Sequence, residues 1–304
     1  MHTLKRILVF AIIALLVVAC RKDDNRVEPP RPFAEQYPVD LAAIEEFLET
    51  HYMEVVNNPG GIDHMDVRFK KIEEGGTQTP IMQHPDLTFR ILELHDLQYK
   101  IYYIPLQPGA AGNPRPTNVD AVFTAYRGTL LDGRVFDYVQ TPTMMMRLDL
   151  LIRGWREIFP QFRTGNYVDN GDGTITFEDF GAGVMFLPSA LAYYNVPQPT
   201  IPAYSPLAFS FKLFEIERID HDNDGIPSYL EDINGDGYLT EADDTDGDGR
   251  PDYLDVDDDG DGVMTRNEIK DANGNILPFD LIPDCSGDVT NPNRLRKHRD
   301  PSCQ

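Results

Sequence analysis

The chain has 304 residues, of which 27 are basic and 50 acidic, so its formal net charge is −23. This excess of acidic residues argues against sequence-independent nucleic-acid binding, which needs clustered Lys and Arg to neutralise phosphates. With three cysteines, neither a disulfide-dense scaffold nor a four-thiolate zinc site is expected. The hydrophobic content of 41% is enough for at least one buried core.

Residues 1–19 have the pattern of an export signal. Lys5 and Arg6 precede an apolar run over residues 7–19. As a helix this run would span about 20 Å, too little for a hydrocarbon core of about 30 Å, so a signal peptide is favoured over a membrane span. The run ends at Cys20, and its last residues resemble a bacterial lipobox, in which the cysteine is lipidated. An ordinary signal peptide with an incidental cysteine is the alternative.

Residues 20–38 are expected to form a lipidated tether. The basic and acidic residues from Arg21 to Asp24 resemble the surface-export signal of Bacteroidota lipoproteins. Four prolines between residues 27 and 38 predict a stiff spacer. Because each buried methylene contributes roughly 0.8 kcal/mol, a multiply acylated cysteine anchors stably. We therefore expect an outer-membrane lipoprotein on the periplasmic or cell-surface face.

Residues 39–96 are expected to be an N-terminal extension that contains a helix. Asp40 is a candidate N-cap, and one helical face would carry Ile44, Phe47, Leu48 and Tyr52. Strands are expected over residues 66–71 and 88–94. The helix is expected to pack on the next domain, with no readable function of its own.

Residues 97–219 have the composition of an antiparallel β domain with one short amphipathic helix, over residues 150–162. A Gly- and Pro-rich segment over residues 107–116 predicts a loop. The strands are expected at residues 98–106, 121–127, 135–137, 184–187 and 207–216.

This region also contains short motifs in a fixed order. They are Ala125-Tyr126-Arg127-Gly128, Asp132-Gly133-Arg134-Val135-Phe136-Asp137, Leu151-Ile152-Arg153-Gly154-Trp155, Leu187-Pro188-Ser189-Ala190-Leu191-Ala192-Tyr193, Ile201-Pro202, and Leu207-Ala208-Phe209-Ser210-Phe211. Together they resemble the FKBP family of peptidyl-prolyl isomerases, over about two fifths of the chain. The resemblance implies an α+β fold, in which a curled antiparallel sheet wraps around one short helix and a hydrophobic pocket lies between them.

The resemblance also implies roles for nine side chains. The pocket floor would be Trp155, and Tyr193 would donate a hydrogen bond to a substrate carbonyl. Asp137 would lie beside Tyr126 and orient the bound amide. Ile201 would overhang the pocket, and its walls would be Tyr126, Phe136, Leu151, Ile152 and Phe209. For each aromatic residue, ordinary core packing is the alternative.

The chemistry of prolyl isomerisation needs no nucleophile, metal or catalytic cofactor. Rotation about an X–Pro bond crosses a barrier of about 18–20 kcal/mol because amide resonance is lost in the twisted state. A pocket lowers this barrier by binding the twisted amide better than the planar one. An apolar site also removes water from the carbonyl oxygen, where water favours the planar form.

Two features depart from the family pattern. Met144 or Met146 occupies a wall position that is usually aromatic, and thioethers tolerate varied partners. An insertion over residues 166–183 contains the turn-rich run from Asp169 to Gly173. This run predicts a hairpin, with a cation site as the alternative reading.

Residues 220–268 hold 18 acidic and 2 basic residues in a repeated pattern. The spacing D-x-[DN]-x-[DN]-G-x5-[DE] places alternate carboxylates on a tight turn, as calcium-binding loops do. We name the copies repeat 1 (220–231), repeat 2 (232–243), repeat 3 (244–255) and repeat 4 (257–268). A fifth copy from Asp271 has Ile276 in place of the glycine. The sixteen candidate ligands are Asp220, Asp222, Asp224, Glu231, Asp232, Asn234, Asp236, Asp243, Asp244, Asp246, Asp248, Asp255, Asp257, Asp259, Asp261 and Glu268.

The repeats follow one another too closely for flanking EF-hand helices. The array therefore resembles thrombospondin type 3 and related bacterial calcium repeats, in which structural Ca²⁺ ions form the core of a stiff rod over residues 220–270. Calcium binding would then be part of folding. A disordered acidic tail is the alternative.

Residues 271–304 form a C-terminal tail. In an exported protein, its two cysteines, Cys285 and Cys303, are expected to form one disulfide. The basic residues Arg294, Arg296, Lys297 and Arg299 either lie on the acidic repeats or are solvated.

Taken together, these patterns favour an exported, lipid-anchored FKBP-type isomerase with a calcium-binding region. Its substrates would be proline-containing segments of envelope or surface proteins, and a monomer without nucleic-acid partners is expected. A non-catalytic proline-peptide-binding module and a calcium-dependent adhesion or assembly protein are the alternatives.

Overall fold

The computed structural model describes residues 29–303. The predicted signal peptide and the lipidation site at Cys20 lie outside the described residues. Within the described part of the chain, no helix is both long and apolar enough to cross a membrane.

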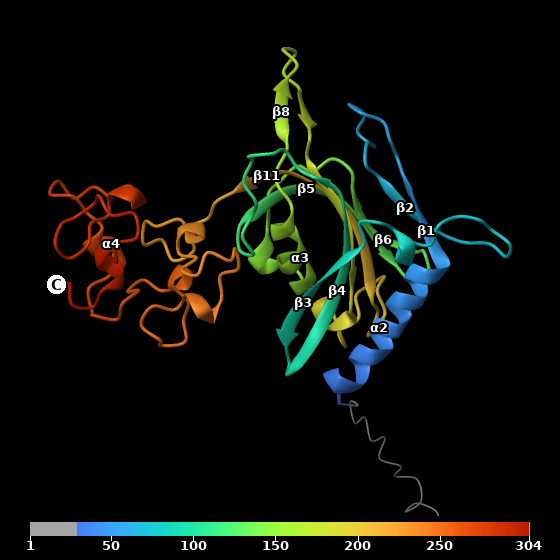
Figure 1. Cartoon of the computed structure of the whole chain (residues 1–304), viewed down its shortest axis with the longest axis horizontal. Helices are drawn as coiled ribbons and strands as arrows, with labels where there is room; N and C mark the ends of the chain where they lie inside the picture. The colour runs from blue at the N-terminus through green and yellow to red at the C-terminus, as the bar shows by residue number, and fades with distance from the viewer. Residues whose placement is uncertain (1–28, 304) are drawn as a thin grey trace, which may run out of the picture. The chain divides into compact units, whose positions relative to one another are not determined.

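The main element is a seven-stranded antiparallel sheet that curls around the short helix α3 (Arg153–Ile158) (Figure 1). Its strand order is β3-β4-β10-β11-β5-β6, with β7 paired to β5. Irregularities in the pairing of β10 with β4, β11 with β5 and β5 with β6 favour this curl, because bulges increase local twist. The strands are β3 (Thr88–Leu94), β4 (Leu97–Pro108), β5 (Ala121–Leu130), β6 (Val135–Val139), β7 (Met146–Arg147), β10 (Gly181–Leu187) and β11 (Leu207–Glu217). The predicted FKBP-like α+β fold class is confirmed.

Both faces of the central strands are buried, because side chains on a strand alternate between the faces. On β10, Met185 and Leu187 pack with α3, whereas Val184 and Phe186 pack with the N-terminal helix. The same alternation on β11 directs Phe209 toward α3. The expected helix over residues 150–162 is shorter in the structure. After Ile158 a 3₁₀ turn (Phe159–Gln161) follows, where Pro160 cannot donate the next helical hydrogen bond.

The N-terminal helix α2 (Phe33–Thr50) begins earlier than predicted. The choice of Asp40 as N-cap was wrong, because Pro38 was taken as the end of the tether although it lies inside the helix. The prediction for Tyr52 was also wrong, since it lies in β1 (His51–Val55), which forms a hairpin with β2 (Val67–Lys71). The expected division at residue 97 falls at the turn of the β3–β4 hairpin.

Asp40 is instead a buried link between α2 and the sheet. Its Oδ2 accepts hydrogen bonds from the backbone N–H and the Oγ of Ser189, at 2.8 and 2.6 Å. Its Oδ1 accepts one from Gln36 Nε2 at 2.7 Å. Ser189 lies in the 3₁₀ turn η4 (Ser189–Leu191), just before Tyr193. The helix thereby fixes the segment that carries a predicted site residue.

The insertion forms a hairpin of β8 (Asn166–Asp169) and β9 (Ile175–Glu178), as predicted (Figure 1). Among the described residues, this hairpin holds no group of three acidic or histidine side chains that converge on one point.

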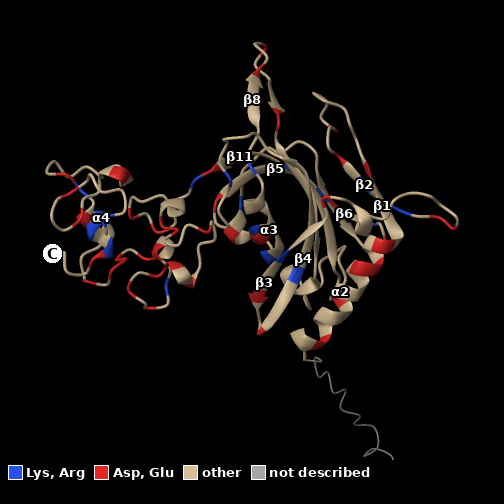
Figure 2. Cartoon of the chain, viewed as in Figure 1, with Lys and Arg blue, Asp and Glu red and all other residues tan. Residues whose placement is uncertain are grey.

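The repeats form tight loops separated by short helical turns, and acidic residues recur along them (Figure 2). These turns are η5 (Ser228–Leu230), η6 (Glu241–Asp243), η7 (Asp252–Leu254) and α4 (Thr265–Glu268). A small cluster of Ile226, Ile269 and Ile282 packs repeat 1 against residues that follow repeat 4. The region is therefore more compact than the expected rod, in which each repeat contacts only its neighbours.

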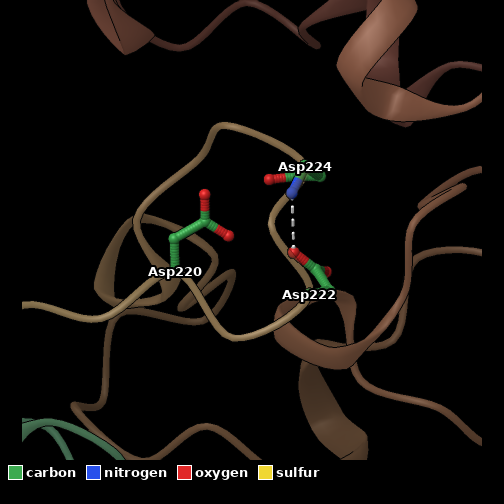
Figure 3. A group of neighbouring side chains, drawn as sticks. All are labelled: Asp220, Asp222 and Asp224. Carbon is green, nitrogen blue, oxygen red and sulfur yellow. Dashed lines mark hydrogen bonds between the residues drawn. The ribbon is translucent and has the colours of Figure 1, made fainter.

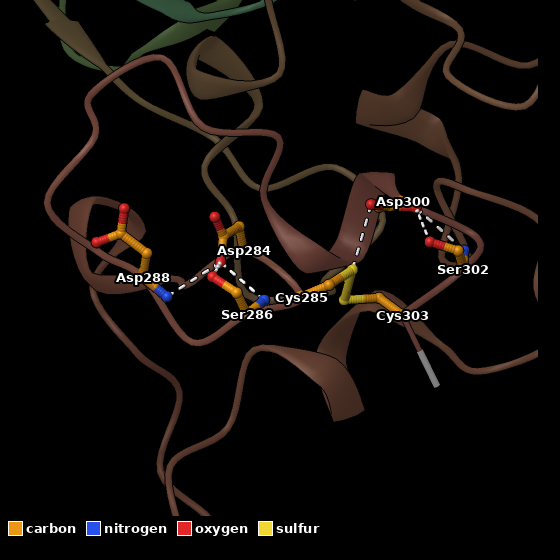
Figure 4. Close-up of a disulfide and its surroundings, with 7 residues drawn as sticks. All are labelled: Asp284, Cys285, Ser286, Asp288, Asp300, Ser302 and Cys303. Carbon is orange, nitrogen blue, oxygen red and sulfur yellow. Dashed lines mark hydrogen bonds between the residues drawn. A yellow bond between two sulfur atoms is a disulfide. The ribbon is translucent and has the colours of Figure 1, made fainter.

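The C-terminal tail also packs on this region. A disulfide joins Cys285 and Cys303, whose Cα atoms are 5.2 Å apart (Figure 4). Arg294 is buried and donates to backbone carbonyls, including that of Ile282 at 2.8 Å. Arg299 lies 3.8 Å from Asp252 in repeat 3. Of the two readings of the basic residues, contact with the repeats is therefore favoured for Arg299.

Repeat 2 packs on residues 97–219, the part that contains the curled sheet and α3, through Tyr238 and Leu239. The Tyr238 hydroxyl donates to the carbonyl of Glu157 in α3 at 2.8 Å and accepts from Gln161 Nε2 at 2.7 Å. Leu239 exchanges two backbone hydrogen bonds with the side chain of Asn118, at 2.8 and 3.0 Å. One repeat is thus attached directly to the helix that carries Trp155.

We predict that Asp40→Ala destabilises the protein by at least about 2 kcal/mol, because it leaves the buried Ser189 N–H and hydroxyl without an acceptor. Urea unfolding followed by circular dichroism measures this change. The control is Glu49→Ala on the exposed face of α2, with an expected change within about 0.5 kcal/mol. Equal effects of the two variants would contradict the link.

Candidate functional site

An aromatic cluster occupies the space between α3 and the curled sheet. Trp155 from α3 and Phe209 from β11 are both buried, and their rings meet edge to face at 5.4 Å. Phe136 from β6 meets Phe209 in the same way at 5.4 Å, and Tyr126 from β5 meets Trp155 at 5.0 Å. The four rings therefore contact one another although they come from four elements.

Tyr126 and Asp137 form a hydrogen-bonded pair at the edge of this cluster. The Tyr126 hydroxyl donates to Asp137 Oδ2 at 2.6 Å, and Asp137 Oδ1 accepts the N–H of Tyr138 at 2.8 Å. Burial and the neighbouring carboxylate raise the pKa of Tyr126 above its usual value. Asp137 itself is exposed, so it is a solvated carboxylate held next to an apolar surface.

The other predicted residues surround the same cluster. Leu151 and Ile152 precede α3 and are half-buried against the core, and Ile201 is buried in it. Tyr193 is 36% exposed, and burial together with Asp137 raises its pKa, so its hydroxyl stays protonated at neutral pH. Of the two methionines considered for the wall, Met146 packs on the core. Met144 is 70% exposed.

Gly128 and Phe159 are two site residues to which sequence reasoning gave no role. A Cβ at Gly128 would lie 2.4 Å from the Phe136 ring and 2.9 Å from that of Phe209, so only glycine admits both rings. Phe159 stacks on Trp155 at 4.9 Å and supports it from behind. The glycine of the Ala125–Gly128 motif was a usable signal for the first of these.

The cluster is an apolar surface with polar groups at one side only, and its central ring, Trp155, is 3% exposed. A proline ring has the size and polarity for such a surface. A nearby carbonyl can then approach the protonated Tyr193 hydroxyl, and the Asp137 carboxylate provides a fixed negative charge beside it. Such groups could favour the twisted form of an imide over the planar form without covalent chemistry.

We predict that Gly128→Ala destabilises the protein by about 1–3 kcal/mol, because the added methyl overpacks the Phe136 and Phe209 rings. Urea unfolding monitored by the fluorescence of Trp155, the chain's single tryptophan, measures this change. Adding Phe136→Leu should recover part of the loss, since it makes room for the methyl group. A double variant less stable than Gly128→Ala would contradict this explanation.

The four repeats share one loop conformation. In each, the N–H of the sixth-position glycine donates to the first aspartate, at 3.1, 2.8, 2.8 and 3.0 Å in order. These glycines have φ values of 82° to 107°, which other residues rarely adopt. In repeats 1, 3 and 4 the loop gathers the acids of the first, third and fifth positions, as Figure 3 shows for Asp220, Asp222 and Asp224.

The repeats differ in whether their carboxylate oxygens are satisfied. In repeats 1 and 4, buried oxygens of Asp222, Asp224, Asp259, Asp261 and Glu268 have no hydrogen-bond partner among the described residues. In repeat 2, Asp243 is occupied instead. It accepts from the backbone N–H groups of Ile233 and Thr240, at 2.9 and 3.0 Å. Buried carboxylate oxygens without partners are therefore found in repeats 1 and 4, whereas Asp243 serves as a loop-stabilising acceptor.

Burial, followed by crowding with other acids, raises the pKa values of several of these carboxyls. Burial, followed by the charges of neighbouring aspartates, raises the pKa of Asp222 to about 8. Burial also raises the pKa of Asp224 to about 6 and that of Glu268 to about 8. Oxygen-only donor sets of this kind suit hard divalent cations such as Ca²⁺, which would replace the protons.

We predict that, in a chelator, the stability of residues 220–270 falls as the pH rises from about 4 to about 8. The unfolded aspartates have a pKa near 3.9, so over this window the folded state holds more protons than the unfolded state. Saturating Ca²⁺ should remove this dependence, because the ion binds the ionised carboxylates. Calorimetric unfolding at several pH values tests it. The same pH profile with and without Ca²⁺ would contradict it.

Comparison with known proteins gives two kinds of similarity. Residues 221–292 match the family described as BamM C-terminal. The chain is also 30% identical over 104 residues to the FKBP-type peptidyl-prolyl cis-trans isomerase FkpA of Escherichia coli strain K12, which covers 34% of this chain and 33% of that protein. FkpA of Escherichia coli O157:H7 matches equally. The chain thus spans about a third of the length of these curated relatives, and it contains a region distantly similar to FKBP-type isomerases.

Two solved structures resemble the chain in part. A peptidyl-prolyl cis-trans isomerase from Pseudomonas syringae pv. tomato is 25% identical, with 45% of this chain and 84% of that one covered and a TM-score of 0.34. The FkpA structure from Escherichia coli is also 25% identical, with 44% and 53% covered and the same TM-score.

Proposed function

We propose that this chain is a peptidyl-prolyl cis–trans isomerase of the FKBP type. Its substrates would be proline-containing segments of envelope or surface polypeptides. The observation that carries the proposal is the contact of Trp155, Phe209 and Phe136 beside the Tyr126–Asp137 hydrogen bond. The distant similarity to FkpA supports the same activity.

In this proposal each predicted side chain keeps one task. Trp155 lies under the proline ring, and Phe136 and Phe209 enclose it. Leu151, Ile152 and Ile201 exclude water from the imide carbonyl, which destabilises the planar amide relative to the twisted one. Tyr193 donates to a substrate carbonyl, and Asp137, held by Tyr126, orients the amide. Residues 97–219 would be the isomerase domain.

An exported, lipid-anchored location is part of the proposal. Its support is the apolar run over residues 7–19 that ends at Cys20, which would be lipidated. The predicted division of the chain into tether, extension, isomerase, repeats and tail belongs to the same proposal.

The test is prolyl isomerisation of a short proline peptide by the full-length protein in detergent with Ca²⁺. We expect the wild type to accelerate cis-to-trans conversion. The double variant Phe136→Ala with Asp137→Ala should lose at least about tenfold of this acceleration, which corresponds to about 1.4 kcal/mol. The matched control replaces one exposed aromatic and one exposed acid of β3, Phe89→Ala with Glu93→Ala, and should keep full activity.

The outcomes separate catalysis from binding. A folded wild type that binds the peptide without accelerating it would make the cluster a proline-peptide-binding site instead. Equal losses in the variant and its control would contradict the assignment of the site.

A second proposed function is calcium binding by residues 220–270. It is favoured by the common conformation of the four repeats and by the unsatisfied buried oxygens of repeats 1 and 4. The ions would be structural, and a role in calcium-dependent adhesion or surface assembly is the alternative to isomerisation as the main activity. Surface phenotypes that survive the Phe136 and Asp137 substitutions would favour that alternative.

A further inference from the structure

An acid from repeat 4 faces two acids of repeat 1. Asp258 approaches Asp224 and Glu231, and one carboxylate oxygen from each lies within 4.8 Å of the other two. Asp258 occupies the second position of repeat 4, which is not a ligand position in loops of this kind. Sequence spacing therefore gave no reason to select it.

All three carboxylates are buried without the partners that buried charges need. Their exposed fractions are 1% for Asp224, 4% for Glu231 and 2% for Asp258. Among the described residues, both oxygens of Glu231 and of Asp258, and Oδ2 of Asp224, have no hydrogen-bond partner.

The nearby positive charge of Arg266 offsets the charge of these acids only in part. Arg266 lies at the same junction, but its Nη1 donates to the carbonyl of Asn223 at 2.6 Å. Within the described part of the chain, no ion pair involves Asp224, Glu231 or Asp258.

Such a group is costly unless something neutralises it. Removing even one unpaired carboxylate from water costs several kcal/mol, and three like charges also repel one another. Five buried oxygens without partners, all from carboxylates, are the donor set that a hard divalent cation prefers. A Ca²⁺ ion would compensate two of the three negative charges.

We propose that Asp258 is a calcium ligand that, together with Asp224 and Glu231, joins repeat 1 to repeat 4. This inference rests on the proposed calcium binding by the repeats and adds a connection that the loops alone do not have. The ion closes a junction where Ile226 already packs against Ile269. Calcium thereby acts between repeats as well as within them.

The test is Asp258→Asn in the full-length protein, studied by thermal unfolding with excess Ca²⁺ and with chelator. With Ca²⁺ the variant should be less stable than the wild type, and its calcium affinity, measured by equilibrium dialysis, should fall by about tenfold or more. In chelator the variant should be more stable, because one of three crowded negative charges is removed. A residue that only causes repulsion would stabilise the variant under both conditions, and that result would overturn the proposal.

Hydrogen exchange provides a second readout of the connection. With Ca²⁺, Asp258→Asn should increase exchange in residues 220–231, although the substitution lies in repeat 4. The matched control is Asp280→Asn, an exposed acid outside the cluster, which should leave stability, affinity and exchange unchanged. Unchanged exchange in repeat 1 would overturn the proposed junction.

A further variant separates this inference from the calcium proposal itself. Asp259→Asn removes a third-position ligand of repeat 4 and should weaken calcium binding if the repeats bind calcium at all. Binding that is lost in Asp259→Asn but normal in Asp258→Asn would overturn only the junction. A wild type that binds no Ca²⁺ would overturn both.

Discussion

The burial of both faces of β10 and β11 is the constraint on which the rest of the structure depends. Residues 181–187 of β10 and 207–213 of β11 are buried on both faces, so each side of the sheet must be covered. Helix α3 covers one side and α2 the other. Because α3 and β11 meet on the first side, Trp155 and Phe209 contact each other there. The candidate site is therefore a consequence of how the sheet is covered, and it lies where the core reaches solvent.

Much of this arrangement was predictable, because the sequence patterns concerned lie within single strands or are motifs in a fixed order along the chain. The sequence predicted strands within β3, β10 and β11, and the family resemblance of the ordered motifs implied that Tyr126 lies beside Asp137. The features that were missed depend on partners far along the chain. The link made by Asp40 was missed because its partner Ser189 is 149 residues away. Asp258 was not predicted as a calcium ligand, because the acids that lie near it belong to another repeat.

The four repeats share one sequence pattern, but their carboxylates make different contacts. The glycine turn and the first aspartate set the same loop four times, but the surroundings decide what the remaining carboxylates contact. In repeat 2, Asp243 is satisfied by backbone N–H groups, and this repeat provides the docking residues Tyr238 and Leu239. In repeats 1 and 4 the oxygens face one another in buried positions. Spacing alone does not distinguish these cases, because burial arises only when the repeats fold back.

The attachment of Tyr238 to α3 has a thermodynamic consequence for both regions. Tyr238 occupies the seventh position of repeat 2, where loops of this kind use the backbone carbonyl as a ligand, while its hydroxyl holds the carbonyl of Glu157. One residue therefore belongs to a candidate ion loop and to the support of Trp155. Suppose that an ion in the loop and a ligand at the aromatic cluster both favour the docked state. By linkage, each would then raise the binding affinity for the other by the same factor.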